Sequence, residues 1–290
     1  MSALLGLLGP GAADSAMVSR LLERLRPRGG ERVELWHGPG VTLAVMRPEW
    51  QLGADFAAGE MVVGEGDFVI VADASIYYRD ELLRGLGRSA ASIAPTTAAR
   101  LILAAYRKWG GDCLDKLEGD YAFLIWDKLQ RRLVCGRDFA GTRPLFSGRF
   151  GNDLVVATAA SAVAAHPAYS GELNRAVVAE AAAGLLGAQL ETVFSGVYAV
   201  PAGSICTAGE AGDVRRVGSW TVPVARELDC RPIGEAAAEL RVLLQHAVGE
   251  RLIATGDTAV WLSGGRDSTA VFAAGRSLLE ARGRDVPPLR

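Results

Sequence analysis

One segment constrains the fold more than any other, because it joins an apolar run to a glycine turn and a helical pattern. It runs from Thr258 to Val271 and has the sequence TAVWLSGGRDSTAV. The apolar residues predict a short strand over Thr258–Ser263, and the residues after the turn predict a helix over Asp267–Ala281. A strand followed directly by a helix is typical of α/β domains. We therefore expect the C-terminal part of the chain to be α/β.

The turn of this segment has the chemistry of an anion site. Gly264 and Gly265 can adopt positive φ angles and let an anion approach the backbone. Free N–H groups at the start of the helix point into the turn, where the helix dipole favours negative charge. Ser263 and Ser268 add hydroxyl donors, and Asp267 can cap the helix or hold a cation. The turn suits a pyrophosphate group, and the alternative is a plain strand-to-helix connection.

The segment differs from two common phosphate-binding motifs. The G-x-x-x-x-G-K-[ST] pattern of a Walker A loop is absent, and the lysines of the chain are Lys108, Lys116 and Lys128, far from the turn. The G-x-G-x-x-G fingerprint of dinucleotide-binding domains is missing as well. Because S-G-G-x-D-S in this context is much rarer than a pair of glycines, we favour a functional loop.

The first 220 residues follow a different pattern, in which short apolar runs and turns predict antiparallel hairpins. Strands are expected over Leu4–Leu8, Val41–Met46, Phe68–Ala72, Tyr121–Trp126, Arg132–Gly136, Pro144–Phe150 and Leu154–Thr158, with a final hairpin from Val197–Thr207 and Arg215–Trp220. Helices are expected over Ser15–Leu25, Asp80–Leu86, Thr96–Trp109 and Glu172–Ala183. This mixture predicts an α+β domain.

A linker is expected between the two parts of the chain. Residues 221–232 contain Pro223 and Pro232 and have no clear periodicity. An amphipathic helix is then expected over Ile233–Ala254. One strand and two helices cannot bury a parallel strand on both faces and both edges. We therefore predict a domain over residues 1–220, a linker over 221–232, and an incomplete α/β domain over 233–290.

Composition and charge exclude several functions. The chain has 31 Lys and Arg against 33 Asp and Glu, which gives a net charge of −2. This charge lacks the basic excess expected of a protein that binds nucleic acid or an anionic membrane. No apolar run reaches the ~20 residues needed to cross a bilayer, and the N-terminus lacks the basic segment of a signal peptide. Cys113, Cys135, Cys206 and Cys230 are far apart in the sequence, which predicts buried reduced thiols. We expect a cytoplasmic protein.

Other polar residues are expected to have structural roles. Asp138 is predicted to be a hydrogen-bond partner in a turn before Gly141, and the isolated His37, His166 and His246 are expected to be structural or solvated. The basic run made by Arg20, Arg24, Arg26, Arg28 and Arg32 is interrupted by glutamates, which predicts a solvated face.

The SGGRDS string at residues 263–268 resembles the PP-loop of the asparagine synthetase family, and further motifs of that family occur in order. LEGDYAFLIWD at 117–127 is similar to L-x-G-x-F-A-F-x-x-W-D, and GRDFAGTRPLF at 136–146 contains R-D-x-x-G-x-x-P-L. TVFSGV at 192–197, followed by Pro201, Gly203 and Trp220, is similar to T-x-F-x-G-V…P-x-G…W. The chain is identified as a member of this family over most of its length.

The resemblance implies an N-terminal-nucleophile-type αββα sandwich, followed by the truncated start of a PP-loop, adenine nucleotide α-hydrolase-like domain. It also implies a reaction in which a carboxylate attacks the α-phosphate of ATP, with Mg²⁺ present, and an amine then displaces AMP to form an amide. By the same resemblance, the residues that would bind ATP are Leu262, Ser263, Gly264, Gly265, Asp267 and Ser268. Asp267 would also be a Mg²⁺ ligand, and the catalytic groups are expected beyond Arg290.

The glutaminase half departs from the family pattern. The family's nucleophile is an N-terminal cysteine exposed by removal of methionine, whereas this chain has Ser2. Asp73 and Ala74 replace an Asn-Gly pair, Ala98 aligns with an aspartate that binds the glutamine amine, and Arg47 matches a carboxylate-binding arginine. We therefore expect glutamine binding to be lost, and Ser2 is a weak candidate for a nucleophile.

Without glutaminase chemistry, the chain resembles the β-lactam synthetases and lasso-peptide macrolactam cyclases, whose substrates supply their own amine. We predict an AMP-forming carbon–nitrogen ligase acting on a small-molecule or peptide carboxylate, completed by a C-terminal remainder of the domain or by a partner protein. Three alternatives stay open: a glutamine- or ammonia-dependent asparagine synthetase, a non-catalytic scaffold with a partner-binding N-domain, and an amidohydrolase that uses Ser2.

Overall fold

A computed structural model describes residues 1–48, 60–87, 97–185, 190–209, 214–222, 224, 230–252 and 259–283. The chain divides into two compact units, Met1–Thr221 and Val222–Arg290.

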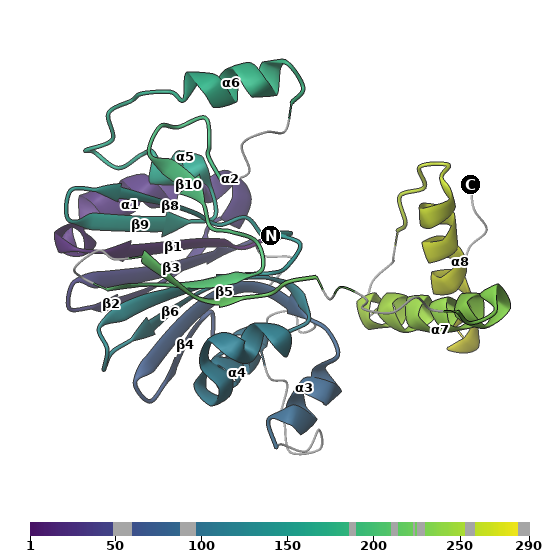
Figure 1. Cartoon of the computed structure of the whole chain (residues 1–290). Coiled ribbons are helices and arrows are strands. Elements are labelled where there is room, and N and C mark those ends of the chain that lie inside the picture. The colour runs from purple at the N-terminus through teal and green to yellow at the C-terminus, as the bar shows by residue number, and fades with distance from the viewer. Residues whose placement is uncertain are drawn as a thin grey trace. The chain divides into compact units, whose positions relative to one another are not determined.

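Two six-stranded sheets build the first unit, and every neighbouring pair of strands is antiparallel (Figure 1). The first sheet has the order β10 (Val197–Ala199), β8 (Phe146–Phe150), β9 (Asp153–Ala157), β1 (Ala3–Leu8), β3 (Val41–Arg47) and β2 (Arg32–Gly38). The second has the order β12 (Val214–Ser219), β11 (Ser204–Gly209), β7 (Arg132–Arg137), β6 (Gly119–Asp127), β5 (Phe68–Ile76) and β4 (Val62–Glu65).

Helices cover the outer face of each sheet (Figure 1). Those over the first sheet are α1 (Ser15–Glu23), α2 (Arg26–Gly29) and α5 (Ala160–Val163), with the short 3-10 helix η1 (Pro10–Ala13). Those over the second sheet are α3 (Arg79–Gly85) and α4 (Ala98–Trp109), and α4 continues into the 3-10 helix η4 (Gly110–Asp115). A further helix, α6 (Arg175–Ala182), lies outside these layers. The αββα layering confirms the architecture predicted for this part of the chain.

The central strand β1 shows how the sandwich is held together. Leu4 and Leu8 lie in the cluster between the two sheets, whereas Leu5 and Leu7 lie in the cluster beneath the helices of the first sheet. Each fully buried leucine contributes about 1.5–3 kcal/mol relative to exposure. At Gly6 a Cβ would lie 3.0 Å from a methyl group of the second sheet, so glycine lets the sheets approach closely here.

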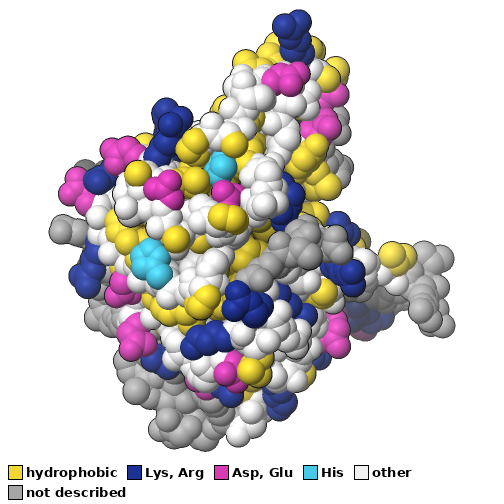
Figure 2. All heavy atoms as spheres, turned by 90° about the vertical axis from the view of Figure 1, so that its left-hand side faces the viewer, with side chains coloured by type: hydrophobic (Ala, Val, Ile, Leu, Met, Phe, Trp, Pro, Cys, Tyr) yellow, Lys and Arg dark blue, Asp and Glu magenta, His cyan; other side chains and the backbone are white. Residues whose placement is uncertain are grey.

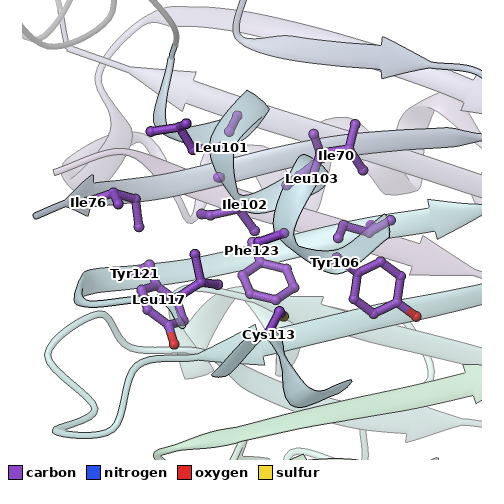
Figure 3. Packing of buried hydrophobic residues seen from close by; sticks show 14 of the residues in the cluster. Ile70, Ile76, Leu101, Ile102, Leu103, Tyr106, Cys113, Leu117, Tyr121 and Phe123 are labelled. Carbon is purple, nitrogen blue, oxygen red and sulfur yellow. The ribbon is translucent and has the colours of Figure 1, made fainter. Parts of the chain in front are cut away.

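The core between the second sheet and α4 is shown in Figure 3. The side chain of Thr97 caps α4 by accepting a hydrogen bond from the backbone N–H of Arg100 at 3.3 Å. Ile102 and Leu103 of the helix are fully buried in one cluster with Ile70 of β5 and Phe123 of β6. The helical spacing of the apolar residues therefore places α4 flat against the sheet.

The structure corrects two predicted elements in the first unit. The run Val197–Thr207 does not form one arm of a hairpin, because it breaks at Pro201 into β10 of the first sheet and β11 of the second. Proline cannot donate to a ladder, so it marks the crossover between the sheets. The hairpin of β11 and β12 is confirmed. The helix predicted from Glu172 begins at Arg175, because the side chain of Asn174 provides its N-cap.

In the second unit, the described residues form two helices, α7 (Ile233–Arg251) and α8 (Arg266–Ala281). Their contact is small and centres on Val248, Leu252 and Ala274. The strand predicted over Thr258–Ser263 is wrong for residues 259–263, which form no regular structure, while Thr258 lies outside the described residues. A lone strand is unstable without a hydrogen-bonded neighbour, and the described part of this unit holds no second strand.

The surface carries mixed charge. On the face shown in Figure 2, basic and acidic side chains are interspersed and separated by hydrophobic and uncharged atoms. Within the described ranges, no helix has the length and apolar character needed to span a membrane.

Candidate functional site

The loop of residues 263–268 lies at the start of α8. Gly264 has a φ of 78°, a conformation that favours glycine, and Gly265 is the N-cap of the 16-residue helix. The Ser263 Oγ atom lies 3.1 Å from the Ser268 Oγ atom and accepts a hydrogen bond of 3.4 Å from the Gly265 N–H. The Ser268 hydroxyl donates to the Gly265 carbonyl at 3.3 Å. The structure therefore brings both predicted serines to the two predicted glycines.

The donor set of this loop fits a pyrophosphate group bound with magnesium. A Cβ placed at Gly264 would meet no atom within 4 Å, so its backbone is open to a ligand. Asp267 is exposed in the first turn of α8, and Leu262 precedes the loop with 38% of its surface exposed. In the described part of the chain, no three His, Cys, Asp or Glu side chains gather as a metal site. A single carboxylate fits Mg²⁺, because Mg²⁺ takes one or two carboxylates together with phosphate oxygens and water.

Ser2 lies in the first unit, immediately before β1, and is buried with 3% of its surface exposed. Its backbone N–H donates to the Asp73 Oδ1 atom at 3.2 Å. Arg47 Nε donates to the Ser2 hydroxyl oxygen at 3.3 Å, and Arg28 Nε donates to the Ser2 carbonyl at 3.2 Å. The predicted site residues Ser2, Arg47 and Asp73 therefore lie together.

Asp73 on β5 is the centre of a buried charge cluster, defined here as Ser2, Arg28, Arg47, Asp73 and Arg143. Its Oδ2 atom accepts a hydrogen bond from Arg28 Nη2 at 3.3 Å and lies 3.9 Å from Arg143 Nη1. Arg47 Nη2 donates to the carbonyl of the residue before Asp73 at 3.4 Å. Two guanidinium groups thus meet the Asp73 carboxylate and that of Arg47 lies beside its backbone, which leaves the Asp73 cluster positively charged.

Burial shapes the electrostatics of this cluster. It lowers the pKa of the Arg47 guanidinium, while Asp73 and Glu34 act in the opposite direction. Burial also lowers the pKa of the Met1 α-amino group, which Asp73 opposes and Arg143 and Arg28 reinforce. Among the described residues, Arg47 Nη1 and Arg143 Nε are buried without a hydrogen-bond partner. The cluster therefore holds buried guanidinium N–H groups that its single carboxylate does not satisfy.

Arg28 and Arg143 belong to this cluster although their sequence pattern did not predict it. Arg28 belongs to the basic run predicted as a solvated face, and that prediction is wrong here, because its side chain is only 18% exposed. Arg143 lies within the GRDFAGTRPLF motif, which is the signal that could have identified it. Ala98 is the first residue of α4, and Ala74 lies opposite Tyr121 in the ladder of β5 and β6.

Asp138 holds the turn that presents Arg143. Its carboxylate is 1% exposed and accepts hydrogen bonds from the backbone N–H groups of Tyr121 at 3.3 Å, Thr142 at 2.8 Å and Arg143 at 3.0 Å. This confirms the predicted role of Asp138 as a hydrogen-bond partner in a turn. His166 is structural as well, because its ring stacks on Phe150 and is 4% exposed.

Comparison with known proteins places these observations in a family context. Residues 1–218 match a family model described as a glutamine amidotransferase domain. The chain is 24% identical over 277 residues to asparagine synthetase [glutamine-hydrolyzing] 3 of Bacillus subtilis (strain 168), covering 93% of this chain and 44% of that protein. It is 32% identical over 221 residues to carboxyethyl-arginine beta-lactam-synthase of Streptomyces clavuligerus, covering 76% of this chain and 39% of that protein.

The chain spans less than half the length of these two relatives. Among solved structures, glutamine phosphoribosylpyrophosphate amidotransferase from B. subtilis, complexed with ADP and GMP, matches with a TM-score of 0.53 and 15% identity, covering 97% of this chain and 64% of that one. At this identity the likeness concerns the fold alone. It identifies the αββα sandwich as the N-terminal-nucleophile type found in glutamine amidotransferases.

Proposed function

Because the chain belongs to the asparagine synthetase family, with a glutamine amidotransferase domain over residues 1–218, we propose that it is part of an ATP-dependent carbon–nitrogen ligase. Its reaction would activate a carboxylate with ATP and form an amide or lactam, releasing AMP and pyrophosphate. The single observation that carries this proposal is the loop at the start of α8, where a glycine with φ of 78° and two paired serine hydroxyls meet a helix N-terminus.

Each loop residue has a role in this proposal. The Ser263 and Ser268 hydroxyls would donate to the phosphate oxygens, and the backbone at Gly264 leaves room for them to approach. The dipole of α8 would stabilise the negative charge. Asp267 would hold Mg²⁺ together with oxygens of the nucleotide. ATP supplies the leaving group that makes the carboxylate reactive, and the acyl substrate would be a small molecule or a peptide.

We further propose that the substrate supplies its own amine, as in a β-lactam or macrolactam ring closure. This is supported by the surroundings of Ser2, whose hydroxyl accepts from Arg47 and whose N–H donates to Asp73. A serine hydroxyl is a far weaker nucleophile than a cysteine thiolate. The similarity to a β-lactam synthase agrees with this, whereas the similarity to a glutamine-hydrolysing asparagine synthetase favours glutamine as the second candidate.

The first test measures MgATP binding by equilibrium dialysis and ATP–pyrophosphate exchange with a panel of amino-acid and peptide carboxylates, using the protein as its gene encodes it. Asp267→Ala and Ser268→Ala should abolish exchange and weaken MgATP binding at least tenfold. Glu280→Gln is the matched control, because Glu280 lies in the same helix, paired with Arg276 at 2.7 Å and about half exposed. Equal MgATP binding by wild type and both loop variants would overturn the assignment.

The second test separates the two nitrogen sources. With an active carboxylate identified, amide formation is followed in the presence and absence of ¹⁵N-amide-labelled glutamine. Product formed without glutamine and without label supports the substrate's own amine. Label in the product, lost in Ser2→Ala, would establish glutamine as the donor and refute the proposed lactam chemistry.

A further inference from the structure

Two buried cysteines lie directly opposite each other in the second sheet. Cys135 on β7 and Cys206 on β11 are register partners and are 8% and 6% exposed. Residues directly opposite in an antiparallel ladder have Cα atoms about 4.5–5.5 Å apart, which falls within the range of about 4.4–6.8 Å that a disulfide spans. Neither cysteine is in a disulfide, and their thiols share a hydrogen bond. Their register therefore places the two Cα atoms within the span of a disulfide.

The surroundings of Cys206 favour its thiolate. The hydrogen bond from the Cys135 thiol lowers the pKa of Cys206 against the effect of burial, and Ser204 and Arg216 lower it further. Ser204 Oγ lies 3.8 Å from the Cys206 Sγ atom, and Arg216 is the register partner of Cys206 on β12. Cys135 shows the opposite shift, because the same hydrogen bond and its burial raise its pKa. The pair therefore contains one nucleophile and one partner that keeps its proton.

The sheet is irregular at this position. The register of β11 and β12 shifts between Ile205 and Cys206, which places an extra residue of β12 beside the cysteine. Such a bulge disrupts the ladder locally and is common at sheet edges. The residues of β12 from Val214 to Val217 are exposed, so β12 is an outer strand of the sheet.

A small cavity between the two sheets is lined by both cysteines. Its volume is about 60 Å³, and its lining includes Cys135, Cys206, Leu154, Val156 and Val200. A cavity needs roughly 10–15 Å³ to hold one water molecule, so this one admits a molecule of a few atoms. Among the described residues that line it, none carries a charged side chain. The cavity therefore suits a small neutral reagent and is too small for a thiol peptide.

We propose that Cys135 and Cys206 form a redox site that a small neutral peroxide oxidises to a cross-strand disulfide. The Cys206 sulfur attacks one peroxide oxygen, the O–O bond breaks, and the departing hydroxide leaves as water after taking a proton. The Cys135 sulfur then attacks the resulting sulfenic sulfur, so that the S–S bond forms and the S–O bond breaks, releasing a second water. The two thiols lose two electrons and two protons, and hydrogen peroxide accepts them.

The test oxidises the reduced, folded protein with a small excess of hydrogen peroxide, blocks the remaining thiols and maps the tryptic peptides. Residues 133–137 and 176–215 are the tryptic peptides that carry the two cysteines. The expected result is their linkage with a loss of two hydrogens, reversed by dithiothreitol, while Cys113 stays reduced. Cys113 is the internal control, because it is fully buried and burial raises its pKa to about 12.

Three variants resolve the steps. Cys135→Ser should accumulate a sulfenic acid at position 206 that dimedone traps, whereas Cys206→Ser should leave Cys135 unmodified. Arg216→Gln should slow the oxidation severalfold, and the matched control Cys113→Ser should not change it. Oxidation of Cys230 before Cys206, or linkage of the two peptides only after denaturation, would overturn the proposal. Peptide mapping of the wild-type protein alone tests whether the Cys135–Cys206 disulfide forms, even where a variant fails to fold.

Discussion

Replacement of Asp73 by asparagine removes one negative charge from the Asp73 cluster and little else. The amide oxygen of asparagine can still accept the hydrogen bond from the Ser2 N–H, which is 3.2 Å from Asp73 in the native protein. Arg28 and Arg143 lose the carboxylate that faces them. Because Asp73 is 3% exposed, water cannot readily take its place. We therefore expect a clear loss of stability in the first unit.

The magnitude follows from the contacts of Asp73. Two unit charges about 4 Å apart interact with about 4 kcal/mol at an effective dielectric constant of about 20. Arg28 and Arg143 lie 3.3 Å and 3.9 Å from the Asp73 Oδ2 atom, and their side chains are 18% and 13% exposed. Desolvation of the charges offsets much of this attraction, but removing one partner of a buried pair costs about 3–5 kcal/mol. We expect Asp73→Asn to lower the free energy of unfolding by about 3 kcal/mol.

The assay is urea unfolding of the full chain, with hydrogen exchange of β5 and β6 peptides reporting the first unit alone. Asp67→Asn is the matched control, because Asp67 is exposed in the turn before the same strand. A loss of unfolding free energy below about 1 kcal/mol, the value of an exposed pair, would refute the reasoning.

Two further predictions concern buried polar groups. Asp138→Ala leaves three backbone donors of its turn without their acceptor, so it should destabilise the first unit by about 3–5 kcal/mol in urea unfolding, and a change below about 1 kcal/mol would contradict this. Burial raises the pKa of Cys113 from 9.0 to about 12, so the unfolded state loses this proton first and stability falls as pH rises from about 9 to about 12. In Cys113→Ala, thermal unfolding across that range should show a shallower decline, and an identical decline would show that the thiol does not contribute.

The sequence predicted the elements whose side chains are buried on a regular pattern. The run Leu4–Leu8 became β1 because both of its faces are covered, and the helix capped by Thr97 follows its apolar period onto the sheet. β2 was missed because it is a half-exposed edge strand that includes Arg32, Glu34 and His37 and carries no continuous apolar run. An edge strand owes its formation to its neighbour β3, and pairing of that kind is not visible in local sequence.

Among the site residues, those that are close in sequence could be predicted and those that meet only in the fold could not. The loop serines and glycines are close in sequence, so a motif finds them, and their hydrogen bonds are local. The Asp73 cluster joins residues more than 25 positions apart, such as Ser2 with Arg28 and with Asp73. Only the folded arrangement of β1, β3 and β5 brings them together. The interpretation of Arg28 as solvated failed because local charge alternation says nothing about such a contact.

The Asp73 cluster ties the two sheets together, and this gives it a role apart from nucleotide chemistry. Ser2 and Arg47 belong to the first sheet or its margin, whereas Asp73 belongs to the second. Elsewhere the sheets meet through apolar side chains, which hold them together without fixing a unique register. A buried polar cluster that contacts both sheets can supply that specificity.

The proposed phosphate contacts all come from the loop before α8 in the other unit. Asp73→Asn should therefore lower the stability of the sandwich. Under conditions where the variant is folded, its MgATP binding should stay within about twofold of wild type. A loss of MgATP binding by the folded variant would show that the cluster takes part in the ligase reaction.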